Sequence, residues 1–333
     1  MNAAVAILGS GRMALNSGAY LLSRGARVWW ICRTAQRARE LEPAAAKLAR
    51  RLERIEPGRR FEWAVRCAGD PDAETCDAVI ECGRETVVEK QAWFERVGRL
   101  AGPRTLLCTA SSSILPDRIR PGLVGLHLFY PVELTGFAEI VADGADGETR
   151  RRIVDLAGSC GLAYVVQDRH SAFAANRILL PLQAEAVRVV AEGADAETVD
   201  RCSVTGLTAL GQLSLMDNAG LDTVAASVDN YLDMEGEADS PFYRPLREAL
   251  ARCLAEGRLG RKNGRGLLAG GPPQWARGTV PVDEAALRGR LSAVMLESCR
   301  DCVREGRAGA GDLRAILTRA FQADGSAVAA AGF

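Results

Sequence analysis

Two histidines occur in this chain of 333 residues, and one of them, His127, lies in a setting that suits proton transfer. It belongs to the run Gly-Leu-His-Leu-Phe-Tyr-Pro-Val (125–132), and Glu139 follows twelve residues later. A carboxylate beside an imidazole orients the ring and stabilises its protonated form. Such a pair could exchange a proton with a secondary alcohol during hydride transfer. The alternative is that His127 is a buried histidine with a structural role only.

A glycine-rich turn near the N-terminus is the second motif with a chemical meaning. The apolar residues 3–8 predict a short buried strand, residues 15–24 have helical spacing, and residues 27–32 predict a second strand. The run Gly-Ser-Gly-Arg-Met-Ala (9–14) lies between the first strand and the helix. A turn of this kind, in a strand–helix–strand unit of about 30 residues, is typical of dinucleotide-binding proteins.

Each residue of this turn has an expected part in holding a dinucleotide. Gly9 permits the tight turn, and Gly11 lets the backbone approach a pyrophosphate at the helix N-terminus, where free N–H groups favour an anion. Ala14 takes the position at which the helix packs against the strand. We therefore expect cofactor contacts from Gly9, Gly11, Arg12, Met13 and Ala14.

The end of the second strand bears on the choice between NAD and NADP. NAD-binding proteins have an acidic residue there, which binds the 2′-hydroxyl of the adenosine ribose. This chain has Cys32 and Arg33 instead. Because a guanidinium binds phosphate in a fork geometry, Arg33 favours NADP over NAD. The alternative is that Arg33 stacks on the adenine and that either cofactor is accepted.

Residues 36–65 are expected to be helical and are rich in cations. The simplest interpretation is a helix face exposed to solvent. A second interpretation is a docking surface for a phosphorylated carrier. The cations are Arg37, Arg39, Lys47, Arg50, Arg51, Arg54, Arg59 and Arg60.

Three further strands are expected, over 77–81, 105–109 and 122–129, with a helix over 85–100 between the first two. Glu81 ends the first of these strands and is expected to contact the cofactor. The last strand brings His127 to its carboxyl end, which is the edge where doubly wound sheets bind ligands.

With these motifs in place, the chain resembles the 3-hydroxyacyl-CoA dehydrogenase family over roughly residues 3–268. The matching blocks follow one another in the family's order. They are 7–32, Val-Ile-Glu at 79–81, Thr-Ala-Ser-Ser-Ser-Ile at 109–114, Gly-Leu-His-Leu-Phe-Tyr-Pro-Val at 125–132, Ala-Glu-Ile-Val at 138–141, Phe-Ala-Ala-Asn-Arg at 173–177, Glu-Gly at 192–193, Met-Asp-Asn-Ala-Gly-Leu-Asp-Thr at 216–223 and Arg-Lys-Asn-Gly-Arg-Gly at 261–266.

The resemblance implies a Rossmann domain, with a doubly wound and mostly parallel α/β sheet, followed by an all-helical domain. It implies an NAD(P)-dependent oxidoreductase that interconverts a 3-hydroxyacyl thioester and its 3-oxo form. By position, His127 resembles the family's catalytic base and Glu139 the residue that orients it. Ser112 and Asn176 resemble the groups that hold the reacting oxygen.

The departures from the family's pattern bear on the substrate. Tyr130 stands where the family has Asn, so we expect it to line and reshape the substrate pocket, and Ala110 also replaces an Asn. The helical insert that follows the second strand is shorter than in the family, where it contacts CoA. The acyl group could therefore be carried by CoA or by an acyl-carrier protein. The alternatives are a dehydrogenase of a free hydroxy acid or sugar acid, and an inactive dinucleotide-binding homologue.

The C-terminal part is expected to be helical throughout and to hold a partial repeat. Residues 177–200 resemble 290–313, with Gly289 in the place of Asn176, and Gly-Gly-Pro-Pro at 270–273 is the expected linker. We expect a dinucleotide-binding domain over 1–168, a helical substrate and dimerisation domain over 169–270, and a helical extension over 271–333. A homodimer is expected, and the extension could enlarge its interface or replace it.

Composition excludes several classes of protein. With 42 basic and 42 acidic residues the chain is neutral, which argues against nucleic acid as the main partner. Two histidines argue against a His-rich metal site. No run of about 18 apolar residues predicts a membrane helix. The ten scattered cysteines suit reduced thiols in a cytoplasmic enzyme.

Overall fold

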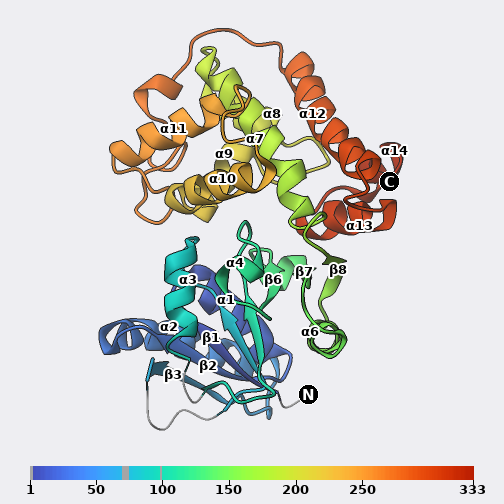
Figure 1. Ribbon diagram of the computed structural model, residues 1–333. Coiled ribbons are helices and arrows are strands. Elements are labelled where there is room, and N and C mark those ends of the chain that lie inside the picture. The colour runs from blue at the N-terminus through green and yellow to red at the C-terminus, as the bar shows by residue number, and fades with distance from the viewer. Residues whose placement is uncertain (1–2, 70–74, 98–99) are drawn as a thin grey trace. The chain divides into compact units, whose positions relative to one another are not determined.

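The computed structural model describes residues 3–69, 75–97 and 100–333, which form two units (Figure 1). The first unit is Met1–Ala172 and the second is Phe173–Phe333. The three expected domains, with boundaries at 168 and 270, stay predictions. Among the described residues, no helix is long and apolar enough to cross a membrane.

The first unit is built on one sheet, and its eight described strands lie in the order β3-β2-β1-β4-β5-β6-β7-β8. All neighbouring strands are parallel except β6 and β7, which are antiparallel. The mostly parallel α/β fold predicted for this part is confirmed. The strands are β1 Ala4–Leu8, β2 Arg27–Cys32, β3 Trp63–Cys67, β4 Ala78–Glu81, β5 Leu106–Thr109, β6 Val124–Leu128, β7 Phe137–Val141 and β8 Ala163–Gln167.

Helices cover both faces of this sheet (Figure 1). Along β1, Val5 and Ile7 join one buried cluster, and Ala4, Ala6 and Leu8 join the other, because successive strand residues point to opposite faces. Side chains of α1, α2 and α6 complete the first cluster, and those of α3 and α4 complete the second. The helices of this unit are α1 Arg12–Ser23, α2 Ala35–Ile55, α3 Val87–Phe94, α4 Pro116–Ile119, α5 Val132–Thr135 and α6 Gly147–Ser159.

Close packing of α1 on β2 depends on Gly18. A Cβ atom added there would lie 2.4 Å from Nε1 of Trp30, so a larger residue would collide with the indole. The same Nε1 donates a hydrogen bond of 2.9 Å to the carbonyl oxygen of Ala14. The buried Trp30 therefore fixes the distance between the helix and the strand beneath it.

Two expected helices are shorter than predicted. The helix expected over 36–65 ends at Ile55, and β3 occupies Trp63–Cys67. Pro57 and Gly58 interrupt the helical pattern, and Gly58 has a φ of 90°, which a helix does not allow. The helix expected over 85–100 is confined to Val87–Phe94, and residues 98–99 of that expectation lie outside the described residues.

The second unit is helical, as predicted (Figure 1). It contains α7 Ala174–Ala191, α8 Ala196–Cys202, α9 Gln212–Ala219, α10 Leu221–Glu235, α11 Arg244–Ala255, a 3₁₀ helix at Gln274–Ala276, α12 Glu284–Arg304, α13 Ala310–Ala315, a π-helix at Ile316–Ala320 and α14 Gly325–Ala330.

The partial repeat has a structural counterpart in α7 and α12, which pack side by side (Figure 1). After α7, Gly193 N–H bonds to the carbonyl of Val190, and after α12 the N–H of Gly306 bonds to the carbonyl of Val303. Both glycines have positive φ, 102° and 68°. The two helices therefore end in the same way, each at a glycine in a conformation that other residues rarely adopt.

Candidate functional site

The pairing of β6 with β7 places His127 directly opposite Glu139. The imidazole Nδ1 lies 2.8 Å from Oε2 of Glu139. The Glu139 side chain is wholly buried, and His127 is 7% exposed. With the carboxylate as acceptor, Nδ1–H is the donor, and a proton exchanged with a substrate would pass through Nε2.

Gln167 is a third member of this group that the sequence analysis missed. Its side-chain amide donates a 2.8 Å hydrogen bond to Oε1 of Glu139, the oxygen that does not face His127. Gln167 lies on β8, which pairs with β7, so three neighbouring strands supply the three side chains. The one available signal was the apolar run Ala-Tyr-Val-Val before Gln167, which is typical of a strand.

The loop that holds Ser112 follows β5 and is organised by a buried carboxylate, Glu85. Its Oε1 accepts hydrogen bonds from the backbone N–H of Ser112 at 2.9 Å and of Ser113 at 3.0 Å. It also accepts from the hydroxyls of Ser111 and Ser113. Glu85 therefore fixes the backbone on which Ser112 is carried.

A buried cation, Lys90, links Glu85 to the end of β4. Its ammonium lies 2.9 Å from Oε2 of Glu81 and 3.3 Å from Oε2 of Glu85. Thr109 donates a further 2.8 Å hydrogen bond to Glu81. The side chain of Glu81 is wholly buried and bonded to these protein groups, and its expected contact with the cofactor stays a prediction.

Opposite charges decide the protonation of this cluster. Burial opposes the charged form of Glu85, but the Lys90 ammonium and the hydroxyls of Ser111 and Ser113 together hold the pKa of Glu85 below its usual value. Burial likewise opposes the charged form of Lys90, yet the carboxylates of Glu85 and Glu81 raise the pKa of Lys90 above its usual value. Glu85 and Lys90 are therefore both charged at neutral pH.

The glycine-rich turn fits a dinucleotide. Gly9 has a φ of 138°, and a Cβ atom there would lie 2.9 Å from the carbonyl oxygen of Cys82 on the neighbouring strand end. A Cβ atom at Gly11 would meet nothing within 4 Å, so the turn is open on that side. Gly11 is the N-cap of α1, and no side chain caps this helix. A pyrophosphate could therefore take the place of a cap.

The loop after β6 is tied to the start of α1, close to this turn in the chain. The guanidinium of Arg12 lies 5.7 Å from the centre of the Tyr130 ring, within the range of a cation–π contact. Asn16 accepts a 2.7 Å hydrogen bond from the backbone N–H of Val132. Tyr130 is 44% exposed. The structure thus brings Arg12 and Tyr130 together, whereas Met13 and Ala14 follow Arg12 within the helix.

Arg33 follows the end of β2, but its guanidinium is bound by α3. It forms an ion pair of 2.7 Å with Glu89 and lies 5.0 Å from the centre of the Trp93 ring. Asn176 lies in the first turn of α7, in the second unit. Its grouping with His127 and Ser112 stays a prediction.

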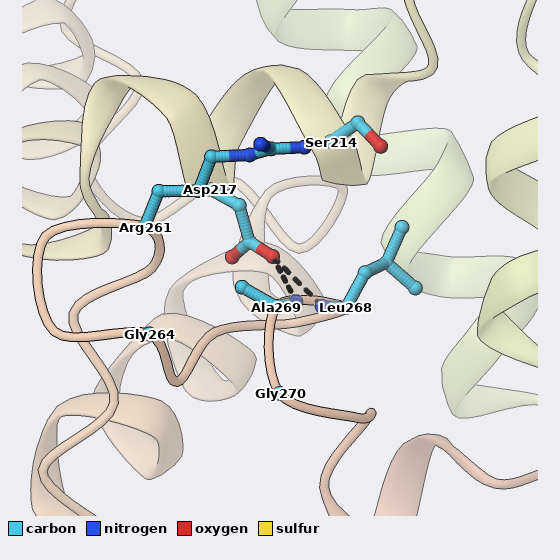
Figure 2. Close-up of a pocket in the computed structure, with 7 residues that line it drawn as sticks. All are labelled: Ser214, Asp217, Arg261, Gly264, Leu268, Ala269 and Gly270. Atoms are coloured by element: carbon cyan, nitrogen blue, oxygen red, sulfur yellow. Dashed lines mark hydrogen bonds between the residues drawn. The ribbon is translucent and has the colours of Figure 1, made fainter.

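The helical unit contains a cavity of about 550 Å³ around the Arg-Lys-Asn-Gly-Arg-Gly motif. Asp217 lies at its wall, and its carboxylate accepts backbone hydrogen bonds of 2.8 Å from Leu268 and Ala269 (Figure 2). It accepts a third, of 2.7 Å, from the backbone N–H of Leu267. Lys262 binds Asp222 at 2.6 Å and Thr223 at 3.0 Å. These motif residues therefore hold the loop against α9 and α10.

Comparisons with known proteins agree with this arrangement. Residues 4–169 match the family described as 3-hydroxyacyl-CoA dehydrogenase, NAD binding domain, and residues 173–270 match the C-terminal domain of the same family. A probable 3-hydroxybutyryl-CoA dehydrogenase of Bacillus subtilis is 31% identical over 243 residues, which is 68% of this chain and 83% of that protein. The human mitochondrial hydroxyacyl-coenzyme A dehydrogenase is 26% identical over 283 residues, 79% of this chain and 89% of that protein.

One solved structure shows how far the fold is shared. The crystal structure of 3-hydroxybutyryl-CoA dehydrogenase from Escherichia coli superposes with a TM-score of 0.72 at 20% identity, over 99% of this chain and 92% of that one. At this identity the likeness concerns the fold alone.

Proposed function

We propose a reaction for this chain from one premise: the chain belongs to the 3-hydroxyacyl-CoA dehydrogenase family, and it is an oxidoreductase of that family with an NAD-binding domain. We infer that it interconverts a 3-hydroxyacyl thioester and the 3-oxo form. The observation that carries the proposal is the chain of buried hydrogen bonds from Gln167 through Glu139 to His127. It binds Nδ1 of the imidazole to a buried carboxylate, which orients the ring for proton exchange.

Each residue of the site has a proposed role in the reaction. A bound nicotinamide dinucleotide, held at Gly9–Ala14, supplies or accepts the hydride. His127 takes the hydroxyl proton through Nε2 in oxidation and returns it in reduction, and Glu139 stabilises the imidazolium that forms. Ser112 and Asn176 donate hydrogen bonds to the reacting oxygen, where charge develops in the transition state. Tyr130 lines the pocket for the acyl group.

Replacement of His127 tests this proposal. In His127→Gln we expect kcat on an acetoacetyl thioester to fall by about 10²–10⁴-fold, because general acid–base catalysis contributes that much. The Kd for the dinucleotide, measured by fluorescence titration, should stay unchanged. His170→Gln, at the other histidine, is the matched control and should keep wild-type turnover. Wild-type kcat in His127→Gln would show that the mechanism is wrong.

The charges on α2 bear on which group carries the acyl chain. Arg39, Lys47, Arg50, Arg51 and Arg54 are exposed on this helix, which supports an anionic carrier, either CoA or an acyl-carrier protein. Steady-state rates on CoA-linked, carrier-linked and free 3-hydroxy acids would separate these substrates. A preference for the free acid by kcat/KM would overturn the thioester proposal.

Two further expectations are kept as proposals. The chain is cytoplasmic, with all ten cysteines as free thiols. It forms a homodimer, which sedimentation equilibrium would show as twice the 35.6 kDa of one chain. The matching family model describes an NAD-binding domain, so the NADP preference expected from Arg33 has no support there.

A further inference from the structure

The surroundings of Arg33 point to a residue that selects the cofactor. The inference rests on the proposed use of a nicotinamide dinucleotide. In such domains the adenosine ribose lies at the carboxyl end of the second strand, where an acidic residue marks NAD and an arginine accommodates the 2′-phosphate of NADP. Here Cys32 ends β2 and Arg33 follows. From the sequence alone, this end of the strand is cationic.

In space, however, α3 brings a carboxylate to this position. Oε2 of Glu89 lies 2.7 Å from Nη2 of Arg33, and the same nitrogen lies 3.4 Å from the backbone carbonyl of Glu89. Trp93, one helical turn further on, lies under the guanidinium with its ring centre 5.0 Å away. Glu89 and Trp93 share a face of α3 because residues four apart are neighbours on a helix.

Two exposed fractions show that the pair lies where a ligand could reach it. The side chain of Arg33 is 36% exposed and that of Glu89 is 28% exposed. The other carboxylate oxygen of Glu89 lies 3.6 Å from Arg84, whose side chain is 80% exposed. Glu89 is therefore the acidic group beside Arg33, and it engages the cation that would otherwise meet a phosphate.

We propose that Glu89 is the specificity-determining residue that makes this chain select NAD over NADP. It would act in two ways. Its carboxylate binds Arg33, so that the guanidinium cannot present its full fork of donors to a 2′-phosphate. Its negative charge also repels that phosphate, which carries a charge of about −1.5 to −2 at neutral pH. A 2′-hydroxyl suffers neither effect and could donate a hydrogen bond to the carboxylate.

The test compares the Kd values of NADH and NADPH by fluorescence titration. We expect the wild-type chain to bind NADH at least tenfold more tightly than NADPH. In Glu89→Gln, which keeps the shape but removes the charge, NADPH should bind at least tenfold more tightly than it does to the wild type. Adding Arg33→Ala to Glu89→Gln should abolish that gain, because the released guanidinium is what would bind the phosphate.

Glu95→Gln is the matched control, since Glu95 lies just beyond the end of the same helix and is exposed. It should leave the ratio of the two affinities within twofold of wild type. Equal affinities in the wild type, or an unchanged ratio in Glu89→Gln, would overturn the inference while leaving the proposed function intact. Failure of the wild-type chain to bind either dinucleotide would instead contradict the proposed function.

Discussion

At the scale of single residues, the proposed role of His127 in proton transfer would depend on side chains that lie deeper in the protein. Glu139 is wholly buried, and each of its oxygens has a partner, His127 on one side and Gln167 on the other. A buried carboxylate left without partners would be strongly destabilising. Gln167 therefore holds the carboxylate in the orientation that the imidazole needs, and it is a positioning residue.

Replacing Glu139 by Gln tests this dependence. The amide keeps the size of the carboxylate but cannot stabilise an imidazolium, so we expect kcat to fall by about 10²-fold or more, within the range of general acid–base catalysis. The Kd for NADH should remain within about twofold. Glu62→Gln, an exposed carboxylate between α2 and β3, is the control. If Glu139→Gln kept the wild-type kcat, Glu139 would have no role in proton transfer.

Local sequence predicted part of this site and missed the rest for a physical reason. A spacing of twelve residues between His127 and Glu139 suggested a pair, and the structure forms it. Gln167 lies 28 residues beyond Glu139, on a strand that the sequence analysis did not predict. Glu89 lies 56 residues beyond Arg33. The order of the strands in the sheet brings these residues together from distant parts of the chain, so their spacing in the sequence does not reveal the contacts.

At the scale of elements, five of the six described interior strands of the sheet could be predicted, because they are apolar runs buried on both faces. The sixth, β7, was missed although all five of its residues are buried. All five residues of β1 are buried. The edge strand β3 was missed, and its five residues are only partly buried. Its sequence, Trp-Ala-Val-Arg-Cys, follows a long charged helix without an apolar run to mark it. Edge strands therefore give a weaker signal than central ones.

The cluster of Lys90, Glu81 and Glu85 ties α3 to the ends of β4 and β5, and its contribution to stability can be tested. In Lys90→Met two buried carboxylates lose their cation, so we expect the free energy of unfolding to fall by about 3–5 kcal/mol. Urea unfolding at pH 7 would measure it. Lys47→Met, at an exposed lysine of α2, should change the same quantity by no more than about 0.5 kcal/mol.

The pH dependence gives this prediction a direction. Because the pKa of Glu85 is lowered in the folded state, its ionised form contributes stability above the pKa of an unfolded glutamate, about 4.3. This contribution is lost as pH falls through the folded pKa. In Lys90→Met the buried carboxylates have lost their cation, so protonating them at low pH stabilises the folded variant. The difference in free energy of unfolding between wild type and variant should therefore shrink from pH 7 to pH 4. A constant difference would mean that Lys90 acts by packing alone.

At the scale of the whole molecule, α7 and α12 pack in a way that follows from the repeat. Arg290, near the start of α12, binds Glu185 in the second half of α7. Arg177, near the start of α7, and Arg307, just beyond the end of α12, both form ion pairs with Glu235. The two helices therefore run antiparallel. Arg177 and Arg290 hold equivalent positions in the two copies, and each forms an ion pair with a glutamate, Glu235 for Arg177 and Glu185 for Arg290.

Helix α12 belongs to the second unit. We therefore predict that substitutions in the contact between α7 and α12 destabilise that unit alone. Leu291 and Met295 are wholly buried on α12. Replacing each by Ala should lower the free energy of unfolding by about 2–5 kcal/mol, since it removes buried side-chain volume. Two units with separate cores need not unfold together, so denaturation should show the helical transition moving to lower urea concentration.

The dinucleotide site provides the independent readout, because its glycine-rich turn lies in the first unit. In Leu291→Ala with Met295→Ala, the Kd for NADH should stay within about threefold of wild type at urea concentrations where the helical unit is still folded. Arg300→Ala, at an exposed position of the same helix, is the control for both measurements. A large loss of NADH affinity in native buffer would show that the order of the cofactor site depends on the helical extension. The two units would then have to be treated as one cooperative structure.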